Sequence, residues 1–230
     1  MKKNILVIAP HHDDEVIGCG GTLLKFKQRQ YKITVVYITA GYSGIPLLGK
    51  EKAIETREKE ARKSSQILGI TNTIFLKEKD RELNFNFHTT SKLIKIMRMT
   101  RPLYIFAPHP NESDREHRIV SEITNEAIWL ANSRYFPQLG KHKSWTYNAI
   151  LYYEVHTPIQ RPQLYVDISD YIDLKTKALN AYKSQIKNTN YSYAISSLNR
   201  YRGIMSSSGG YVEAFEVKRF KEKLLFQVDE

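Results

Sequence analysis

Two histidines and three carboxylates stand together near the start of the 230-residue chain, in the run His11-His12-Asp13-Asp14-Glu15. An apolar stretch, residues 5–9, comes directly before this run and is typical of a buried strand. Ligands in open α/β sheets bind at the carboxyl ends of strands, which is where the run falls. Imidazole nitrogens and carboxylate oxygens suit zinc or a similar divalent ion. An acidic turn that caps the next helix is the plainer alternative, but capping needs one carboxylate and no histidine.

The same run resembles the first signature of the PIG-L/LmbE-like zinc-dependent N-acetylglucosaminyl deacetylases, a strand followed by Ala-His-Pro-Asp-Asp-Glu. Residues 10–15 align with that signature, with His12 in place of the family proline. The resemblance implies that His11 and Asp14 are zinc ligands and that Asp13 is the base. It gives no role to His12, which we expect to be a loop histidine near the mouth of the site.

A second polar run, Asp114-Arg115-Glu116-His117, follows the apolar stretch 103–107 and a proline-rich loop. It resembles the second signature of the family, His-x-Asp-His, whose last histidine is the third ligand. The resemblance therefore implies that His117 binds the metal, with Glu116 either supporting the site or lying in solvent. Asp114 replaces the first histidine of the signature, which stabilises the oxyanion or protonates the amine in family members. Either Asp114 or another group, such as His109, takes over this task, or the task is done differently. We therefore expect Asp114 to be a catalytic residue and His109 to be a substrate contact.

Substrate contacts are implied by the resemblance alone. Arg57 and Asp80 lie where the family places contacts to sugar hydroxyls and anionic groups, although each could instead belong to a surface ion pair. Weaker candidates for the mouth of the site are His156, Arg161 and Arg202. Histidines without a motif, expected at the surface, are His88 and His142.

The chain is strongly basic, with 35 Lys and Arg against 24 Asp and Glu and a net charge of +11. Such an excess attracts anions, so phosphate-bearing substrates and nucleic acid both have to be considered. The basic residues are interspersed with Glu at helical spacing, as on solvated helix faces, and no nucleic-acid-reading motif accompanies them. Nucleic-acid binding is therefore the weaker hypothesis, and the charge favours an anionic small-molecule substrate.

Several other classes of protein are disfavoured. No apolar run approaches the ~18 residues of a membrane span, and the apolar stretch after Met1 lacks a small-residue cleavage site, so we expect a strand and a cytoplasmic protein. A single cysteine, Cys19, excludes an intramolecular disulfide and predicts a small buried residue. The glycines at 18, 20 and 21 lack the spacing of a phosphate-binding or dinucleotide-binding loop. A homo-oligomer is compatible with the sequence.

Apolar runs rich in β-branched residues alternate with helical patterns along most of the chain. This alternation predicts an α/β fold, Rossmann-like and three-layered, with a mainly parallel sheet and helices on both faces, in a single domain over residues 1–230. Expected strands are residues 5–9, 33–39, 73–76, 103–107, 149–153 and 164–168. Expected helices are residues 16–30, 52–68, 91–99, 116–131 and 171–187, and residues 196–210 are expected to form a loop near the site.

The leading hypothesis is removal of an N-acetyl group from an N-acetylglucosamine-type amino sugar or its conjugate by zinc-activated water. The acceptor could also be a nucleotide-linked sugar or an antibiotic glycoside. A metal phosphoesterase would use similar ligands but usually needs a second metal bridged by further carboxylates. Metal content separates these hypotheses from that of a nucleic-acid-binding module, which needs none.

Overall fold

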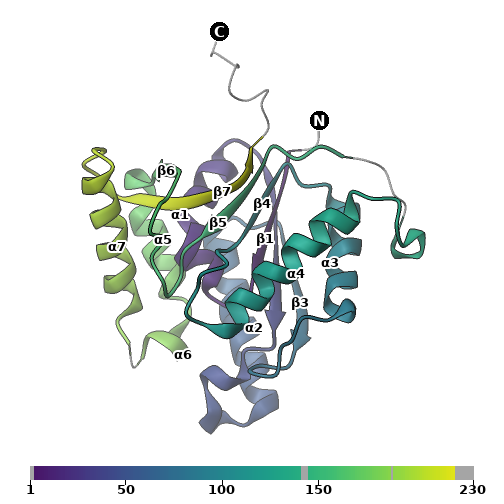
Figure 1. Ribbon diagram of the computed structural model, residues 1–230. Coiled ribbons are helices and arrows are strands. Elements are labelled where there is room, and N and C mark those ends of the chain that lie inside the picture. The colour runs from purple at the N-terminus through teal and green to yellow at the C-terminus, as the bar shows by residue number, and fades with distance from the viewer. Residues whose placement is uncertain (1–2, 141–144, 188, 221–230) are drawn as a thin grey trace.

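The computed structural model describes residues 3–140, 145–187 and 189–220 (Figure 1). Seven strands form one sheet in the order β3-β2-β1-β4-β5-β7-β6. The first five are parallel to one another, and β7 runs antiparallel to both of its neighbours. The strands are β1 Asn4–Ala9, β2 Lys32–Thr39, β3 Asn72–Glu78, β4 Tyr104–Pro108, β5 Ala149–Tyr153, β6 Leu164–Asp167 and β7 Val212–Phe220.

Helices cover both faces of this sheet, which confirms the predicted α/β architecture (Figure 1). They are α1 Asp14–Gln28, α2 Lys50–Leu68, α3 Phe87–Thr100, α4 Arg115–Ala131, α5 Ile172–Leu179, α6 Lys183–Ile186 and α7 Tyr191–Met205. Alternate residues of β1 enter two separate cores, because successive strand side chains point to opposite faces. Ile5 and Val7 pack with residues of α1, α2 and α5, whereas Leu6 and Ile8 pack with residues of α3 and α4. A strand buried on both faces has to be apolar throughout, as this one is.

The order of the strands fixes the place of the site. The chain leaves β1 toward β2 and β3 on one side, and β4 lies against the other side of β1. The connections after β1 and β4 therefore diverge from neighbouring strand ends, which is the topological switch point where open α/β sheets bind ligands. The two polar runs of the sequence follow these two strands.

Two predictions for the C-terminal third were wrong. Residues 196–210, expected to be a loop, lie largely in α7, which Asn190 caps by accepting a hydrogen bond from the backbone N–H of Tyr193 at 3.2 Å. The expected helix over 171–187 is divided into α5 and α6. In α7 only Ile195, Asn199, Arg202 and Gly203 are buried, so the apolar stripe is too sparse to reveal the helix by its periodicity.

The glycines that follow the first polar run have a packing role. A side chain at Gly18 would collide with the ring of Tyr153, and a Cβ at Gly21 would lie 2.6 Å from Ile168. Cys19 between them is fully buried, and burial raises the pKa of its thiol well above the ordinary value, as expected for a structural cysteine. Among the described residues, no helix combines the length and apolar character that crossing a membrane would require.

Candidate metal centre and active site

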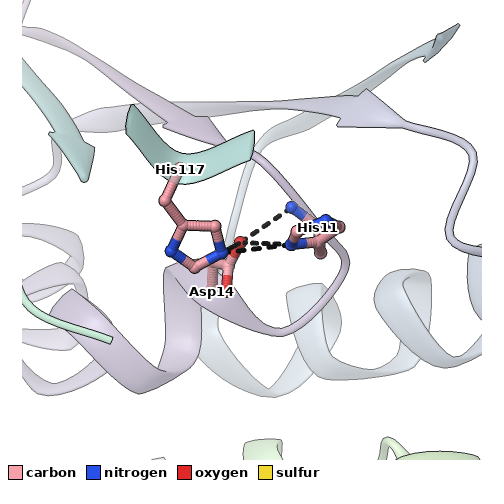
Figure 2. Close-up of side chains that lie close together, drawn as sticks. All are labelled: His11, Asp14 and His117. Atoms are coloured by element: carbon pink, nitrogen blue, oxygen red, sulfur yellow. Dashed lines mark hydrogen bonds and ion pairs between the residues drawn. The ribbon is translucent and has the colours of Figure 1, made fainter. Parts of the chain in front are cut away.

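Two tight connections at the switch point carry the chemistry-bearing residues. The first leads from β1 through His11 into α1, whose first residue is Asp14. The second leads from β4 into α4, in which His117 is the third residue. Parallel pairing of β1 with β4 brings these connections side by side, so residues about 100 positions apart in the sequence face one another (Figure 2).

His11, Asp14 and His117 form a compact triangle of potential ligand atoms. His11 Nδ1 lies 3.1 Å from His117 Nε2 and 3.5 Å from Asp14 Oδ2, and His117 Nε2 lies 3.3 Å from Asp14 Oδ2. Donors bound about 2.0–2.1 Å from a zinc ion at tetrahedral angles lie about 3.3–3.4 Å apart. The three atoms therefore have the spacing of three corners of a zinc tetrahedron, and the fourth corner is left for a small ligand.

The outer nitrogen of each imidazole faces a buried carboxylate. His11 Nε2 lies 2.8 Å from Glu116 Oε2, and His117 Nδ1 lies 3.8 Å from Glu112 Oε2. Placing the N–H of each neutral ring toward its carboxylate leaves the lone pairs of His11 Nδ1 and His117 Nε2 directed at each other. Two lone pairs and a carboxylate oxygen at this range repel unless a cation lies between them, so the residues fit a divalent ion. Glu116 thus orients a ring of the centre rather than lying in solvent.

The protonation states of the cluster reflect the same crowding. Burial alone would raise the pKa of Asp14, but the imidazoles of His117 and His11 hold it well below its usual range. Burial lowers the pKa of His117. Burial also opposes protonation of His11, yet Asp14 and Glu116 together raise its pKa to about 10. A proton on His11 therefore occupies the place that a metal cation would take.

Asp13 lies beside the triangle and points elsewhere. Its backbone is in the left-handed region, with φ 117°, and its side chain makes no capping hydrogen bond to α1. The carboxylate lies 3.4 Å from a guanidinium nitrogen of Arg57, which also donates to the carbonyl oxygen of His12. Burial raises the pKa of Asp13 to about 6, with Arg57 opposing the rise. The pKa of Asp13 is therefore raised toward neutral pH, and its side chain does not cap the helix that it precedes.

A cavity of about 240 Å³ opens in front of this group. The lining carries charges of both signs, since it includes Asp13 and Asp14 together with Arg57 and Arg81. The remaining lining residues are His11, Ile17, Gly41, Ser43, Gly44, Asp80, His156, Gln185 and Tyr191. A volume below the ~300 Å³ of a typical small-molecule pocket holds one part of a substrate rather than a long chain.

Both carboxylate oxygens of Asp114 make structural contacts. Its Oδ1 accepts a hydrogen bond from the backbone N–H of Glu116 at 2.7 Å, which caps α4, and its Oδ2 lies 2.8 Å from Arg81 Nη1. Asp114 does not line the cavity, whereas Arg81 does. The departure from the family signature thus replaces an imidazole with a carboxylate that holds an arginine at the rim.

The three expected substrate contacts are placed differently from one another. Arg57 is 2% exposed and lines the cavity, so it is not part of a surface ion pair. Asp80 also lines the cavity, but its two oxygens accept hydrogen bonds from the backbone N–H groups of Gly41 and Ser43, both at 2.7 Å. His109 is 2% exposed and is not among the lining residues. It makes ring contacts of 2.8 Å to the Thr157 carbonyl and 3.3 Å to the backbone N–H of Asn111.

The expectation that His12 is a loop histidine at the mouth of the site was wrong. Its side chain is buried against the rings of Tyr37 and Phe75, with centroid distances of 4.9 and 5.4 Å, and these two rings also stack on each other. Burial and the neighbouring Arg57 lower its pKa, so the ring is neutral. The polar run therefore places the side chain of His11 in the site and that of His12 in a buried aromatic cluster.

The three weaker candidates for the mouth of the site lie in different environments. His156 lines the cavity, Arg161 is exposed, and Arg202 is buried in an ion pair with Glu154 at 2.6 Å. His88 is exposed, as expected, and His142 lies outside the described residues. Arg81 and Glu112 could not be found from the sequence, because neither belongs to a signature and both act through long-range contacts.

Comparisons with known proteins bear on this site. The sequence model of the GlcNAc-PI de-N-acetylase family, PIG-L, matches residues 6–128. Diacetylchitobiose deacetylase of Thermococcus kodakarensis is 29% identical over 195 residues, covering 80% of this chain and 70% of that protein. A probable N-acetyl-alpha-D-glucosaminyl L-malate deacetylase 2 of Bacillus anthracis is 26% identical, with coverages of 80% and 82%. The solved structure of N,N'-diacetylchitobiose deacetylase from Pyrococcus horikoshii superposes with a TM-score of 0.83 at 27% identity, covering 98% of this chain and 86% of that one.

Proposed function

The chain belongs to the GlcNAc-PI de-N-acetylase family, and from this membership we propose that it is a metal-dependent hydrolase of N-acetylglucosamine-type amino sugars. The reaction is hydrolysis of the acetamide bond, which yields acetate and a free amine. Its relatives named above are N-acetylglucosamine-type deacetylases. The observation that carries the proposal is a pair of imidazole nitrogens, 3.1 Å apart, that lie 3.5 and 3.3 Å from Asp14 Oδ2 at the switch point.

His11, Asp14 and His117 are the proposed ligands of one divalent ion, and the borderline N and O donor set favours zinc. The bound ion would lower the pKa of a coordinated water toward ~7 and polarise the acetamide oxygen. Glu116 keeps the ring of His11 in the orientation that presents Nδ1 to the centre. Among the described residues one such cluster is found, which supports a one-metal site over the two-metal site of a phosphoesterase.

Asp13 is the proposed base. Its carboxylate faces the cavity beside the ligands, takes a proton from the attacking water and returns it to the departing nitrogen. Arg57 holds this carboxylate in place and favours its ionised form at neutral pH. Asp114, with both oxygens engaged, acts by positioning Arg81.

The substrate is proposed to be an amino sugar whose conjugated group is anionic. Arg57 and Arg81 both reach the cavity, and Arg81 has a side chain that is 59% exposed at the rim. A guanidinium in that position recognises a carboxylate or phosphate through paired N–H groups. Arg81→Gln should therefore slow turnover of an anionic conjugate more than that of free N-acetylglucosamine. Arg62→Gln, at a side chain 57% exposed on α2, is the matched control.

The proposal is tested by acetate release from a panel of N-acetylated sugars after metal is restored to stripped protein. The panel includes N-acetylglucosamine, diacetylchitobiose and an N-acetylglucosamine conjugate that bears carboxylates. We expect release from at least one member, dependent on one metal ion per chain. Absence of release across the panel by metal-loaded protein, or a requirement for two ions, would contradict the proposed function.

A further inference from the structure

Among the residues that the structure describes, His156 is the one imidazole on the cavity wall that is not a proposed ligand. Its ring stacks on that of His117, with centroids 5.2 Å apart and planes inclined by 25°. His117 itself is fully buried, whereas His156, which contacts it, is exposed. No hydrogen bond or ion pair engages the ring nitrogens of His156 within the described chain, which leaves them available to a substrate.

The backbone that carries this free ring is held by a buried carboxylate. Glu112, which is 1% exposed, accepts hydrogen bonds from three consecutive backbone N–H groups, those of Val155, His156 and Thr157. The four contacts span 2.7–3.2 Å and use both carboxylate oxygens. Charge-assisted hydrogen bonds of this kind are the strong ones, so the loop after β5 is fixed to the loop after β4.

Further contacts fasten the same loop on both sides of His156. The Thr157 carbonyl lies 2.8 Å from His109 Nε2, and Thr157 Oγ1 accepts a hydrogen bond from the backbone N–H of Ser113 at 2.8 Å. Glu154 accepts a hydrogen bond from the backbone N–H of Ile159 at 2.7 Å. A surface loop with a buried anchor at each end presents its one exposed imidazole in a fixed position, as catalytic donors require.

From this geometry, and resting on the proposed deacetylation, we propose that His156 is a catalytic residue that donates a hydrogen bond to the acetamide oxygen. The two arginines of the cavity already have carboxylate partners, Asp13 for Arg57 and Asp114 for Arg81. The ring of His156 has no such partner among the described residues. A neutral imidazole N–H suffices for this role, since the donor gives up no proton.

The atoms balance without a proton leaving His156. The water oxygen attacks the acetamide carbon, one water proton passes to Asp13, and the electron pair of the C=O π bond moves onto oxygen. His156 donates its hydrogen bond to that oxygen while it carries the negative charge. The pair then returns, the C–N bond breaks with its electrons on nitrogen, and nitrogen takes the proton from Asp13, which gives the amine and acetic acid.

The test compares His156→Ala, His156→Gln and the surface control His88→Ala in metal-loaded protein. Loss of an oxyanion donor costs about 10²–10³-fold in kcat, so we expect this loss in His156→Ala with little change in KM. His156→Gln retains a side-chain N–H and should recover part of the loss, whereas His88→Ala should match the wild type. Metal content and melting temperature should be equal in all four proteins. Unchanged kcat in His156→Ala, no recovery in His156→Gln, or a loss that follows lost metal would overturn the inference.

A binding measurement separates this inference from the proposed function. Methylphosphonate is a stable tetrahedral anion, and calorimetry gives its affinity for each metal-loaded protein. We expect His156→Ala to weaken binding roughly tenfold or more, as for a lost hydrogen bond to a charged group, with His88→Ala unchanged. A wild type that releases no acetate would contradict the proposed function alone. Equal methylphosphonate affinity in wild type and His156→Ala would overturn the role of His156 whatever the activity.

Discussion

The N-termini of α1 and α4 are built from the same parts and use them differently. Each helix follows a strand at the switch point, begins after an aspartate, and supplies one proposed ligand, Asp14 or His117. Asp114 has an extended backbone with φ −71°, and its carboxylate caps α4. Asp13 has φ 117°, and its side chain makes no cap to α1. The same residue type at the same helix position is structural in one case and faces the cavity in the other.

The difference shows how backbone geometry decides which carboxylate is available for chemistry. Asp114 satisfies one oxygen with a backbone N–H and the other with Arg81. Asp13 is left with the long contact to Arg57, and the left-handed backbone turns its carboxylate toward the cavity. A conformation that costs an ordinary residue of order 1–3 kcal/mol persists where the surrounding fold enforces it.

The strongest contrast is expected between Asp13→Asn and Asp114→Asn. The first variant loses the base and should lower turnover by ~10²-fold or more, while its fold and metal content are kept. The second keeps the cap of α4 and should cost much less. Acetate release with metal analysis measures both. Near-normal activity of fully loaded Asp13→Asn would show that the proton goes elsewhere.

Glu116 connects the two helix starts, since it contacts His11 from the first turn of α4. Glu116→Gln should weaken metal binding about 10–100-fold, because the carboxylate fixes the orientation of the His11 ring. Glu122→Gln, at an exposed position of the same helix, is the control. Competition with a chelator gives the affinities. Equal metal affinities of the two variants would show that Glu116 does not support metal binding.

The acid limb of the pH profile reports on Asp13. Burial raises its pKa to about 6 and Arg57 opposes the rise, so the base is ionised above that pH and protonated below it. A bound cation lowers the pKa further, and kcat/KM should therefore fall only as the pH drops to about 6 or below. Arg57→Gln removes the opposing charge and should move this limb to higher pH. An acid limb at the same pH in Arg57→Gln would show that Arg57 does not influence the pKa of the base.

The smallest effects are expected on stability at Asp114. Asp114→Ala removes the cap of α4 and should cost ~1 kcal/mol, whereas Asp114→Asn retains a capping oxygen and should cost less. Burial alone would raise the pKa of Asp114, but Arg81 and the backbone N–H of Glu116 hold it below the ordinary value. Its ionised form therefore stabilises the fold above the unfolded pKa, and this stabilisation is lost as pH falls through the folded pKa. Urea unfolding at two pH values checks both points.

Restoring the family histidine is a further check on Asp114. Asp114→His removes both the cap and the partner of Arg81, and the side chain it replaces does not line the cavity. Turnover on simple N-acetylglucosamine should not rise. A clearly faster variant would mean that Asp114 is a degraded catalytic position.

The parallel half of the fold could be predicted from the sequence because its signals are local. The strand at Asn4–Ala9 is an unbroken apolar run, and the strand at Tyr104–Pro108 is one of the same kind. The C-terminal edge of the sheet could not be predicted in this way. Strand β7 was not predicted, because its residues acquire their role by antiparallel pairing with β5 and β6. Helix α7 was missed because its polar residues, such as Asn199 and Arg202, are buried by partners far along the chain.

The site divides in the same way. A metal site at the end of the first strand could be anticipated from the polar run that follows it, and His11, Asp14 and His117 could be singled out by the resemblance of the two runs to the family signatures. The surroundings of His12 and His109 could not, because each ring is placed by tertiary contacts. Arg81 and Glu112 carry no pattern in the sequence, and their roles emerge from contacts across 33 and 44 positions.

One divalent ion is proposed to be held by residues from the starts of both helices, α1 and α4. Elemental analysis of stripped and reloaded wild type, His11→Ala and His117→Ala measures it most directly, with His88→Ala as the control. One ion per chain is predicted in wild type and in the control, and a marked loss in both ligand variants, since three donors at 3.1–3.5 Å separation form the proposed centre. Undiminished metal in either His11→Ala or His117→Ala would contradict that ligand assignment.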